Sequence, residues 1–190
     1  MAGKSCTVRE QLIEAGIREI SEYGLQNFSI RRIAAGCGVS CAAPYKHFKD
    51  KEELIAAIIG HIDAIWHARQ AAVIAGCAGD TQACIVAVSV EYVRFLVENP
   101  QFRSIIMTSY PQLDAMYAKL RGHMTETSAA LVDIYCSSVG MPEDVRRRKL
   151  YVVRSLIYGA ALMFDNGEME YNEANLRFVE CSIKREFELP

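Results

Sequence analysis

The feature that most constrains this chain is a pair of short helical patterns joined by a glycine-bearing turn, within residues 29–51. Ser29 is a good N-cap for the first helix, because its hydroxyl can accept a hydrogen bond from an unpaired amide of the first turn. Gly36 and Gly38 follow, and either can take the positive φ that ends a helix at little steric cost. Ser40 would cap the second helix. This spacing predicts a helix-turn-helix, in which one helix braces against a duplex and the other enters its major groove.

Positive charge is concentrated in the same segment. Residues 28–51 carry five basic side chains against one acid, Asp50, a local balance of +4, whereas the whole chain has a formal net charge of −2. Such a run is also typical of an ordinary solvated surface. Combined with the helix-turn-helix pattern, it indicates a surface for phosphate groups. The five are Arg31, Arg32, Lys46, Lys49 and Lys51.

A longer pattern, over roughly residues 7–60, extends the motif on both sides. Its runs are Glu14-Ala15-Gly16-Ile17, Gly24, Ser29-Ile30-Arg31-Arg32-Ile33-Ala34, Gly38-Val39-Ser40, Tyr45-Lys46-His47-Phe48 and Lys51-Glu52-Glu53-Leu54. In these runs the chain resembles the TetR/AcrR family of bacterial transcriptional regulators. The resemblance implies an N-terminal three-helix DNA-binding domain, followed by a helical ligand-binding and dimerisation domain.

The resemblance also implies roles for individual side chains. Arg31 would reach bases or phosphates from the second helix, and the residues of the third helix nearest the bases would begin at Ser40. Hydroxyl, imidazole and ammonium donors near a helix end suit phosphate oxygens, which position a protein without specifying sequence. The expected DNA-binding set is Ser29, Arg31, Arg32, Ser40, Cys41, Ala42, Ala43, Tyr45, Lys46, His47 and Lys51.

Two departures from this pattern concern the third helix. Cys41, Ala42 and Ala43 have almost no hydrogen-bonding capacity, so direct base readout is expected to be weak, with thymine methyl contacts and DNA shape contributing. Pro44 lies about four residues after the cap, where it removes an amide donor and disfavours helical geometry at Ala43. We therefore expect a tight first turn in an otherwise intact recognition helix over 41–48.

The rest of the chain is expected to be helical. Hydrophobic residues make up 51% of the 190 residues, there are five Pro, and no alternating strand pattern occurs. The prediction is an all-α fold of about nine helices in three parts. These are a helix-turn-helix domain over 1–50, a connector helix over 51–76, and an effector-binding and dimerisation domain over 77–190. The later helices are expected at 81–99, from Pro100, at 112–139, at 142–164 and at 172–187.

The last two expected helices each carry one apolar stripe at helical spacing. In the family that the chain resembles, these helices pair with their copies to form a four-helix bundle. A single helix-turn-helix also needs a two-fold partner to read two half-sites, so we expect a homodimer on an inverted repeat of double-stranded DNA. Each stripe could instead be satisfied inside the monomer. The expected interface is Leu150, Val153, Ile157, Ala160, Phe164, Leu176, Val179, Ile183 and Phe187.

Bulky, adaptable side chains lie between the connector and the dimer helices. Met and aromatic residues can line an apolar pocket, although they also fill ordinary cores. The resemblance implies a small hydrophobic effector whose binding shifts the population away from the DNA-binding conformation and releases the operator. The candidate ligand-binding residues are Trp66, Phe95, Phe102, Met107, Tyr110, Tyr117, Met124, Tyr135 and Tyr158.

Seven Cys occur without framework spacing in a chain that shows no signal peptide, which is typical of reduced thiols in the cytoplasm. Cys37 and Cys41 are four residues apart, but no CxxC or His cluster accompanies them, so neither a metal site nor a cofactor is expected. No membrane partner is expected.

Two alternatives remain open at this stage. One is a helical thiol enzyme in which His123 meets Cys136 or Cys84, although no sequence feature activates a nucleophile and no glycine-rich phosphate loop occurs. The other is a DNA-binding regulator controlled by a protein partner instead of a small molecule. The sequence leaves open the effector, the operator and its genes, whether the output is repression or activation, and any redox role of Cys37 and Cys41.

Overall fold

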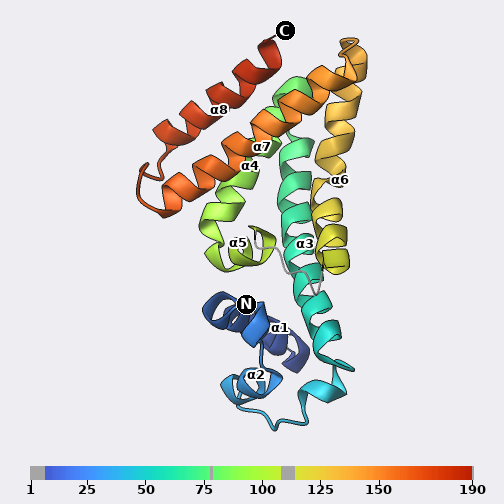
Figure 1. The fold of residues 1–190 in the computed structure, drawn as a ribbon, viewed down its shortest axis with the longest axis vertical. Helices are drawn as coiled ribbons and strands as arrows, with labels where there is room; N and C mark the ends of the chain where they lie inside the picture. Colours follow the sequence, from blue (N-terminus) through green and yellow to red (C-terminus); the bar gives the residue numbers. More distant parts are fainter. Residues whose placement is uncertain (1–6, 78, 108–113, 190) are drawn as a thin grey trace. The chain divides into compact units, whose positions relative to one another are not determined.

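The computed structural model describes residues 7–77, 79–107 and 114–189, and every regular element in them is a helix (Figure 1). This confirms the predicted all-α fold class, with eight α-helices in the described residues against the nine or so expected. They are α1 (Val8–Tyr23), α2 (Ile30–Gly36), α3 (Lys51–Ala75), α4 (Thr81–Glu98), α5 (Pro100–Met107), α6 (Asp114–Ser138), α7 (Glu143–Asp165) and α8 (Glu173–Glu188). Two short 3₁₀ helices, η1 (Leu25–Asn27) and η2 (Pro44–Lys46), lie in the connections.

Side-chain caps set several of these helix starts. The Thr7 hydroxyl accepts a hydrogen bond from the Glu10 amide at 3.2 Å, and the Glu10 carboxylate accepts one from the Thr7 amide at 2.8 Å. This is the predicted capping box of α1. Asp80 and Asn172 each accept from the amide three residues later, at 2.9 Å, and so begin α4 and α8. The helix starts were therefore predictable from local chemistry.

The described residues form two compact units, one within residues 1–65 and 100–121 and the other within 66–99 and 122–190. In the first unit, α1 contacts both α2 and α5. In the second, α4 contacts α7 and α8, and α7 contacts α8. The predicted division into DNA-binding, connector and effector parts concerns function and stays a prediction.

Close packing in the first unit depends on a glycine in α1. A Cβ atom placed on Gly16 would lie 2.5 Å from Cδ1 of Ile58 on α3. Ile58 is fully buried, as is Leu12 one turn before Gly16. The absence of a side chain at Gly16 therefore sets how closely α1 and α3 approach.

A buried lysine ends α8 in the second unit. Lys149, on α7, is 1% exposed, and its Nζ donates to the carbonyl oxygens of Glu186 at 2.7 Å and Leu189 at 2.6 Å. The last carbonyls of a helix lack partners within the helix and carry partial negative charge. Lys149 therefore ties the end of α8 to α7.

In the described part of the chain, no helix has the length and apolarity that a membrane span requires.

The Gly16 contact gives a stability prediction. Gly16→Leu should lower the free energy of unfolding by about 1–3 kcal/mol, because the added side chain overpacks the contact with Ile58. Gly60→Leu is the matched control, since Gly60 is an exposed helical glycine of α3 with open space around it. Urea unfolding followed by circular dichroism measures both. Equal stability of the two variants would contradict the close approach at Gly16.

Candidate functional site

The turn after α2 has the hydrogen bonds of a Schellman motif. The Val39 amide donates to the carbonyl of Ala34 at 3.0 Å, and the Gly38 amide donates to that of Ala35 at 3.1 Å. Gly38 has a φ of +68°, the left-handed conformation that glycine adopts at little cost. The glycine turn of the predicted helix-turn-helix is confirmed, with Gly38 as its left-handed residue.

The segment after the turn differs from the prediction. The expectation of an intact recognition helix over 41–48 is wrong, because the only helical element there is the short η2. The Ala43 amide donates to the Ser40 carbonyl at 2.9 Å and the Lys46 amide to the Ala43 carbonyl at 3.1 Å, which is the spacing of tight turns. Pro44 has no N–H to donate to the carbonyl four residues earlier. The missing amide removes the first bond of the expected helix, and Pro44 instead begins η2.

Two buried residues hold this segment to the first unit. Pro44 is buried, and Phe48 is 2% exposed beneath the Arg9 guanidinium, which lies 5.1 Å from its ring centroid. Between them Tyr45, Lys46 and His47 are exposed, and Tyr45 is 58% exposed. A rigid anchor at each end thus presents three phosphate-compatible side chains to solvent.

A buried carboxylate positions the start of α2. Glu19 of α1 is 6% exposed, and its Oε1 accepts hydrogen bonds from the Ser29 amide at 3.0 Å and from Nε of Arg32 at 2.9 Å. Nη2 of Arg32 also donates to Glu19 and to the Asn27 carbonyl, and its guanidinium lies 4.4 Å from the Tyr23 ring centroid. Arg32 is therefore committed to contacts within the unit.

Sequence reasoning missed Glu19, although a signal existed. It follows Ala15 and Gly16 at helical spacing, on the buried face of α1. A charged residue on such a face requires a buried partner. That partner is Arg32, which the sequence had placed on the DNA-binding surface.

The predicted DNA-binding residues fall into two groups in the structure. The first group is half-buried or held by neighbours. Arg32 is held by Glu19, Ser29 caps α2 by accepting from the Arg32 amide at 3.4 Å, Lys51 lies 5.5 Å from the Phe28 ring centroid, and Ala43 is half-buried. The second group is exposed and consists of Arg31, Ser40, Cys41, Ala42, Tyr45, Lys46 and His47.

The predicted dimer residues lie inside the second unit. Leu150 is half-buried and the other eight are at most 7% exposed, so both stripes fill the core that α4, α7 and α8 share. This is the alternative that the sequence left open. The exposed apolar side chains of α7 and α8 are different residues: Tyr151 is 73% exposed, Phe178 65% and Leu162 44%.

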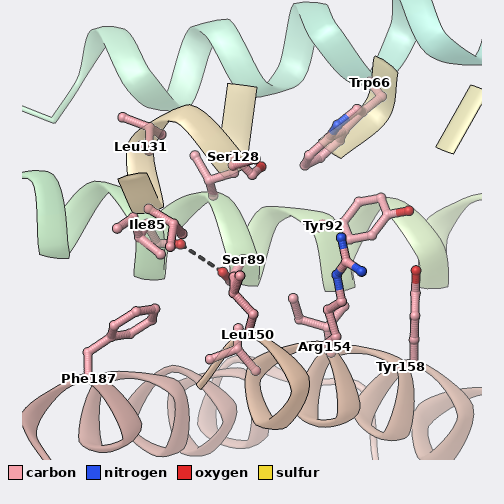
Figure 2. A pocket seen from close by; sticks show the side chains of 15 residues that line it. Trp66, Ile85, Ser89, Tyr92, Ser128, Leu131, Leu150, Arg154, Tyr158 and Phe187 are labelled. Carbon is pink, nitrogen blue, oxygen red and sulfur yellow. Dashed lines mark hydrogen bonds between the residues drawn. The ribbon is translucent and has the colours of Figure 1, made fainter. Parts of the chain in front are cut away.

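A cavity of about 110 Å³ lies within the second unit, and α3, α4, α6, α7 and α8 contribute its walls (Figure 2). Of the nine predicted ligand-binding residues, Trp66 and Tyr158 line it. Phe95 is buried next to Trp66, with ring centroids 5.4 Å apart. The Tyr135 hydroxyl donates to the Phe187 carbonyl at 3.4 Å, and Phe102 is buried in the first unit. Tyr110 and the side chains of Met107, Tyr117 and Met124 lie outside the described residues.

Four polar lining residues were missed: Ser89 and Tyr92 on α4, Ser128 on α6 and Arg154 on α7. The sequence held a signal for Arg154. It lies four residues after Leu150 and next to Val153, and so within the apolar stripe of the expected helix. Burial raises the pKa of the Tyr92 phenol strongly, and the neighbouring Tyr158 raises it further. Tyr92 therefore stays protonated and can donate a hydrogen bond to a ligand.

Residues 12–58 match the sequence model of a family described as bacterial regulatory proteins, tetR family. They include most of α1, all of α2, the Gly38 turn and the start of α3. In these residues the chain matches the TetR family. No curated protein matches the chain in sequence.

Solved structures share the TetR-family fold over nearly the whole chain. A TetR family transcription regulator from Marinobacter aquaeolei VT8 has a TM-score of 0.74 at 17% identity, and 94% of each chain is covered. The fatty acid degradation regulator FadR from Bacillus halodurans has a TM-score of 0.71 at 13% identity, covering 92% of this chain and 93% of that one. AmtR from Mycobacterium smegmatis has a TM-score of 0.68 at 17% identity, covering 100% and 90%. The chain thus shares its fold with these proteins over nearly its whole length.

Two adjacent arginines of α2 should behave differently when replaced. Arg32→Met should lower the urea midpoint of unfolding, because the buried Glu19 carboxylate loses its charged partner. Arg31→Met is the matched control, since Arg31 is exposed and its replacement should leave the midpoint unchanged. An unchanged midpoint for Arg32→Met would show that Arg32 does not hold α2 to α1.

Proposed function

We propose that this TetR-family protein is a cytoplasmic repressor that binds an inverted-repeat operator as a homodimer and is released from it by a small effector. The observation that carries the proposal is the exposed set of side chains between α2 and η2, with Arg31 on α2 and Tyr45, Lys46 and His47 at η2. The proposal has three parts, which are DNA binding, dimerisation and effector response.

The proposal of DNA binding is supported by two kinds of exposed side chain, those that can contact phosphates and those that can contact bases. Tyr45, Lys46 and His47 supply phosphate donors, which give affinity and register without sequence information. Arg31 is the exposed side chain best able to bind a base edge with two hydrogen bonds. Cys41 and Ala42 are exposed but small, so they suit contact with thymine methyl groups.

Dimerisation is assigned to the outer faces of α7 and α8. Tyr151 and Phe178 are the most exposed large apolar side chains among the described residues, at 73% and 65%. Leu162 adds a third apolar contact, 44% exposed. Large aromatic side chains carry much of the binding energy in protein interfaces. A self-complementary contact through these faces would form the isologous dimer that an inverted repeat requires.

Effector response is assigned to the cavity of the second unit. Its volume of about 110 Å³ is somewhat below the roughly 150 Å³ of a cavity that holds benzene. The effector part that enters this conformation is therefore small, and larger effectors would need the lining helices to move. A ligand that favours such a movement shifts the population away from the DNA-binding state by its differential affinity.

The thiols of the second unit do not favour the enzyme alternative. Burial raises the pKa of Cys84 to about 11, and burial also raises the pKa of Cys136. A catalytic thiol needs the opposite shift, because the thiolate is the nucleophile. The side chain of His123 lies outside the described residues.

Two substitutions separate phosphate contact from base reading. Lys46→Ala should weaken binding to all duplexes and reduce the salt slope of log K by about one. Arg31→Ala should weaken binding and also relax sequence preference. Lys184→Ala is the control, because Lys184 is an exposed lysine of α8 in the other unit. Fluorescence anisotropy with labelled duplexes at several salt concentrations measures all three, and identical behaviour of Lys46→Ala and Arg31→Ala would contradict the assigned roles.

The dimer assignment predicts a change in mass. Phe178→Asp should convert the protein from dimer to monomer in light scattering, because it places a charge at the centre of an apolar contact. Ile134→Asp should leave the mass unchanged, since Ile134 is similarly exposed, at 59%, but lies on α6. A dimer that survives Phe178→Asp would place the interface elsewhere.

A further inference from the structure

Two polar side chains in the middle of the cavity have partners within the protein: Ser89 donates to the Ile85 carbonyl and Ser128 accepts from Gln70. The other three polar side chains gather at one end. Figure 2 shows Arg154 and Tyr158 extending from α7 toward Tyr92 on α4, while Ile85 and Phe187 lie at the opposite end. The two ends therefore differ in chemistry as well as in position.

Arg154 brings a permanent charge to this end, since a guanidinium stays protonated in proteins. Among the described residues, no carboxylate forms an ion pair with Arg154, whereas Arg94 and Arg146 each bind acidic side chains. Arg154 is exposed, and its charge lowers the pKa of the Tyr92 phenol, in opposition to burial, which raises it. The guanidinium donors at the polar end are thus available to a ligand.

The aromatic wall beside Arg154 is rigid. The Trp66 and Tyr92 ring centroids lie 4.6 Å apart, and Tyr92 stacks on Phe95 at 6.3 Å. Trp66 and Phe95 are at most 1% exposed. A hydroxyl fixed by such packing can orient a ligand group at little entropic cost.

We propose that the cavity binds an amphipathic monocarboxylate, with the carboxylate at Arg154 and the hydroxyls of Tyr92 and Tyr158 and with the apolar body extending past Trp66 toward Ile85 and Phe187. This inference rests on the proposed effector response and names the chemical class of the effector. Guanidinium groups bind carboxylates through two parallel hydrogen bonds, and phenol hydroxyls can donate to the remaining lone pairs. An uncharged ligand of the same shape leaves the guanidinium unpaired, and an amine meets a like charge.

The size of the cavity selects the probes. The space of about 110 Å³ is smaller than the engineered cavity of about 150 Å³ that holds benzene, so the probes are limited to chains of at most six carbon atoms. Hexanoate, 1-hexanol and hexylamine share one apolar chain and differ in the charge of the head group. They therefore isolate the contribution of the carboxylate.

Trp66 makes the measurement possible without a label. It is the single tryptophan of the chain and it lines the cavity, so its fluorescence reports occupancy. Titration of the full-length protein should give hexanoate a dissociation constant about 10- to 100-fold lower than that of 1-hexanol, the range expected for a charge-assisted hydrogen bond. Hexylamine should bind more weakly than 1-hexanol.

Substitutions test which residues cause the preference for hexanoate. Arg154→Gln should weaken hexanoate about 10- to 100-fold and leave 1-hexanol unchanged, and Tyr158→Phe should weaken hexanoate by a smaller factor. Arg147→Gln is the control, because Arg147 is an exposed arginine of α7 that does not line the cavity. The wild-type comparison of the three ligands requires no variant and stands even if a variant fails to fold.

The outcomes distinguish this inference from the regulator proposal. Equal affinities for hexanoate and 1-hexanol, equal effects of Arg154→Gln and Arg147→Gln, or no binding by any of the three ligands would overturn the carboxylate assignment. Separate anisotropy measurements with duplex DNA test regulation. Hexanoate binding through Arg154 without DNA binding would leave the ligand class standing and remove the regulator, and DNA binding with no preference for hexanoate would do the reverse.

Discussion

The buried carboxylate of Glu19 is the interaction on which the first unit depends. It lies on the packed face of α1 and accepts hydrogen bonds from the Ser29 amide and the Arg32 guanidinium, so one group fixes both the N-cap amide of α2 and a charged side chain of its first turn. A buried charge without a partner costs far more than an exposed one. The orientation of α2, and with it the outward direction of Arg31, therefore follows from Glu19.

In the segment after α2, Pro44 limits the surface that could contact base edges. Pro44 removes the amide that would continue an α-helix, and the chain instead makes tight turns between Ser40 and η2. A short element with small groups at Cys41 and Ala42 offers few direct contacts to base edges. Sequence preference would then depend strongly on Arg31 and on DNA shape, while affinity depends on the phosphate donors at η2.

Much of the fold was predictable from the sequence, because helix starts depend on local capping chemistry. Thr7, Asp80 and Asn172 each accept from an amide three residues later, and the expected helices begin there. The site was less predictable, since it depends on tertiary packing. The stripe at Val153 and Ile157 could face a second subunit or the core with the same spacing, and only the packing of α4 against α7 places it inside. Arg154 belongs to the same stripe, and only the cavity in the structure identified it as a lining residue.

The central claim is that the segment from α2 to η2 binds DNA in a two-fold arrangement. Selection of bound duplexes from a random pool by the purified protein, followed by sequencing, tests it most directly. The account predicts enrichment of an inverted repeat whose half-site centres are separated by about one helical turn, 10–10.5 base pairs, or a multiple of it. A selected pool with no enriched sequence, or with one unpaired half-site, would contradict the claim.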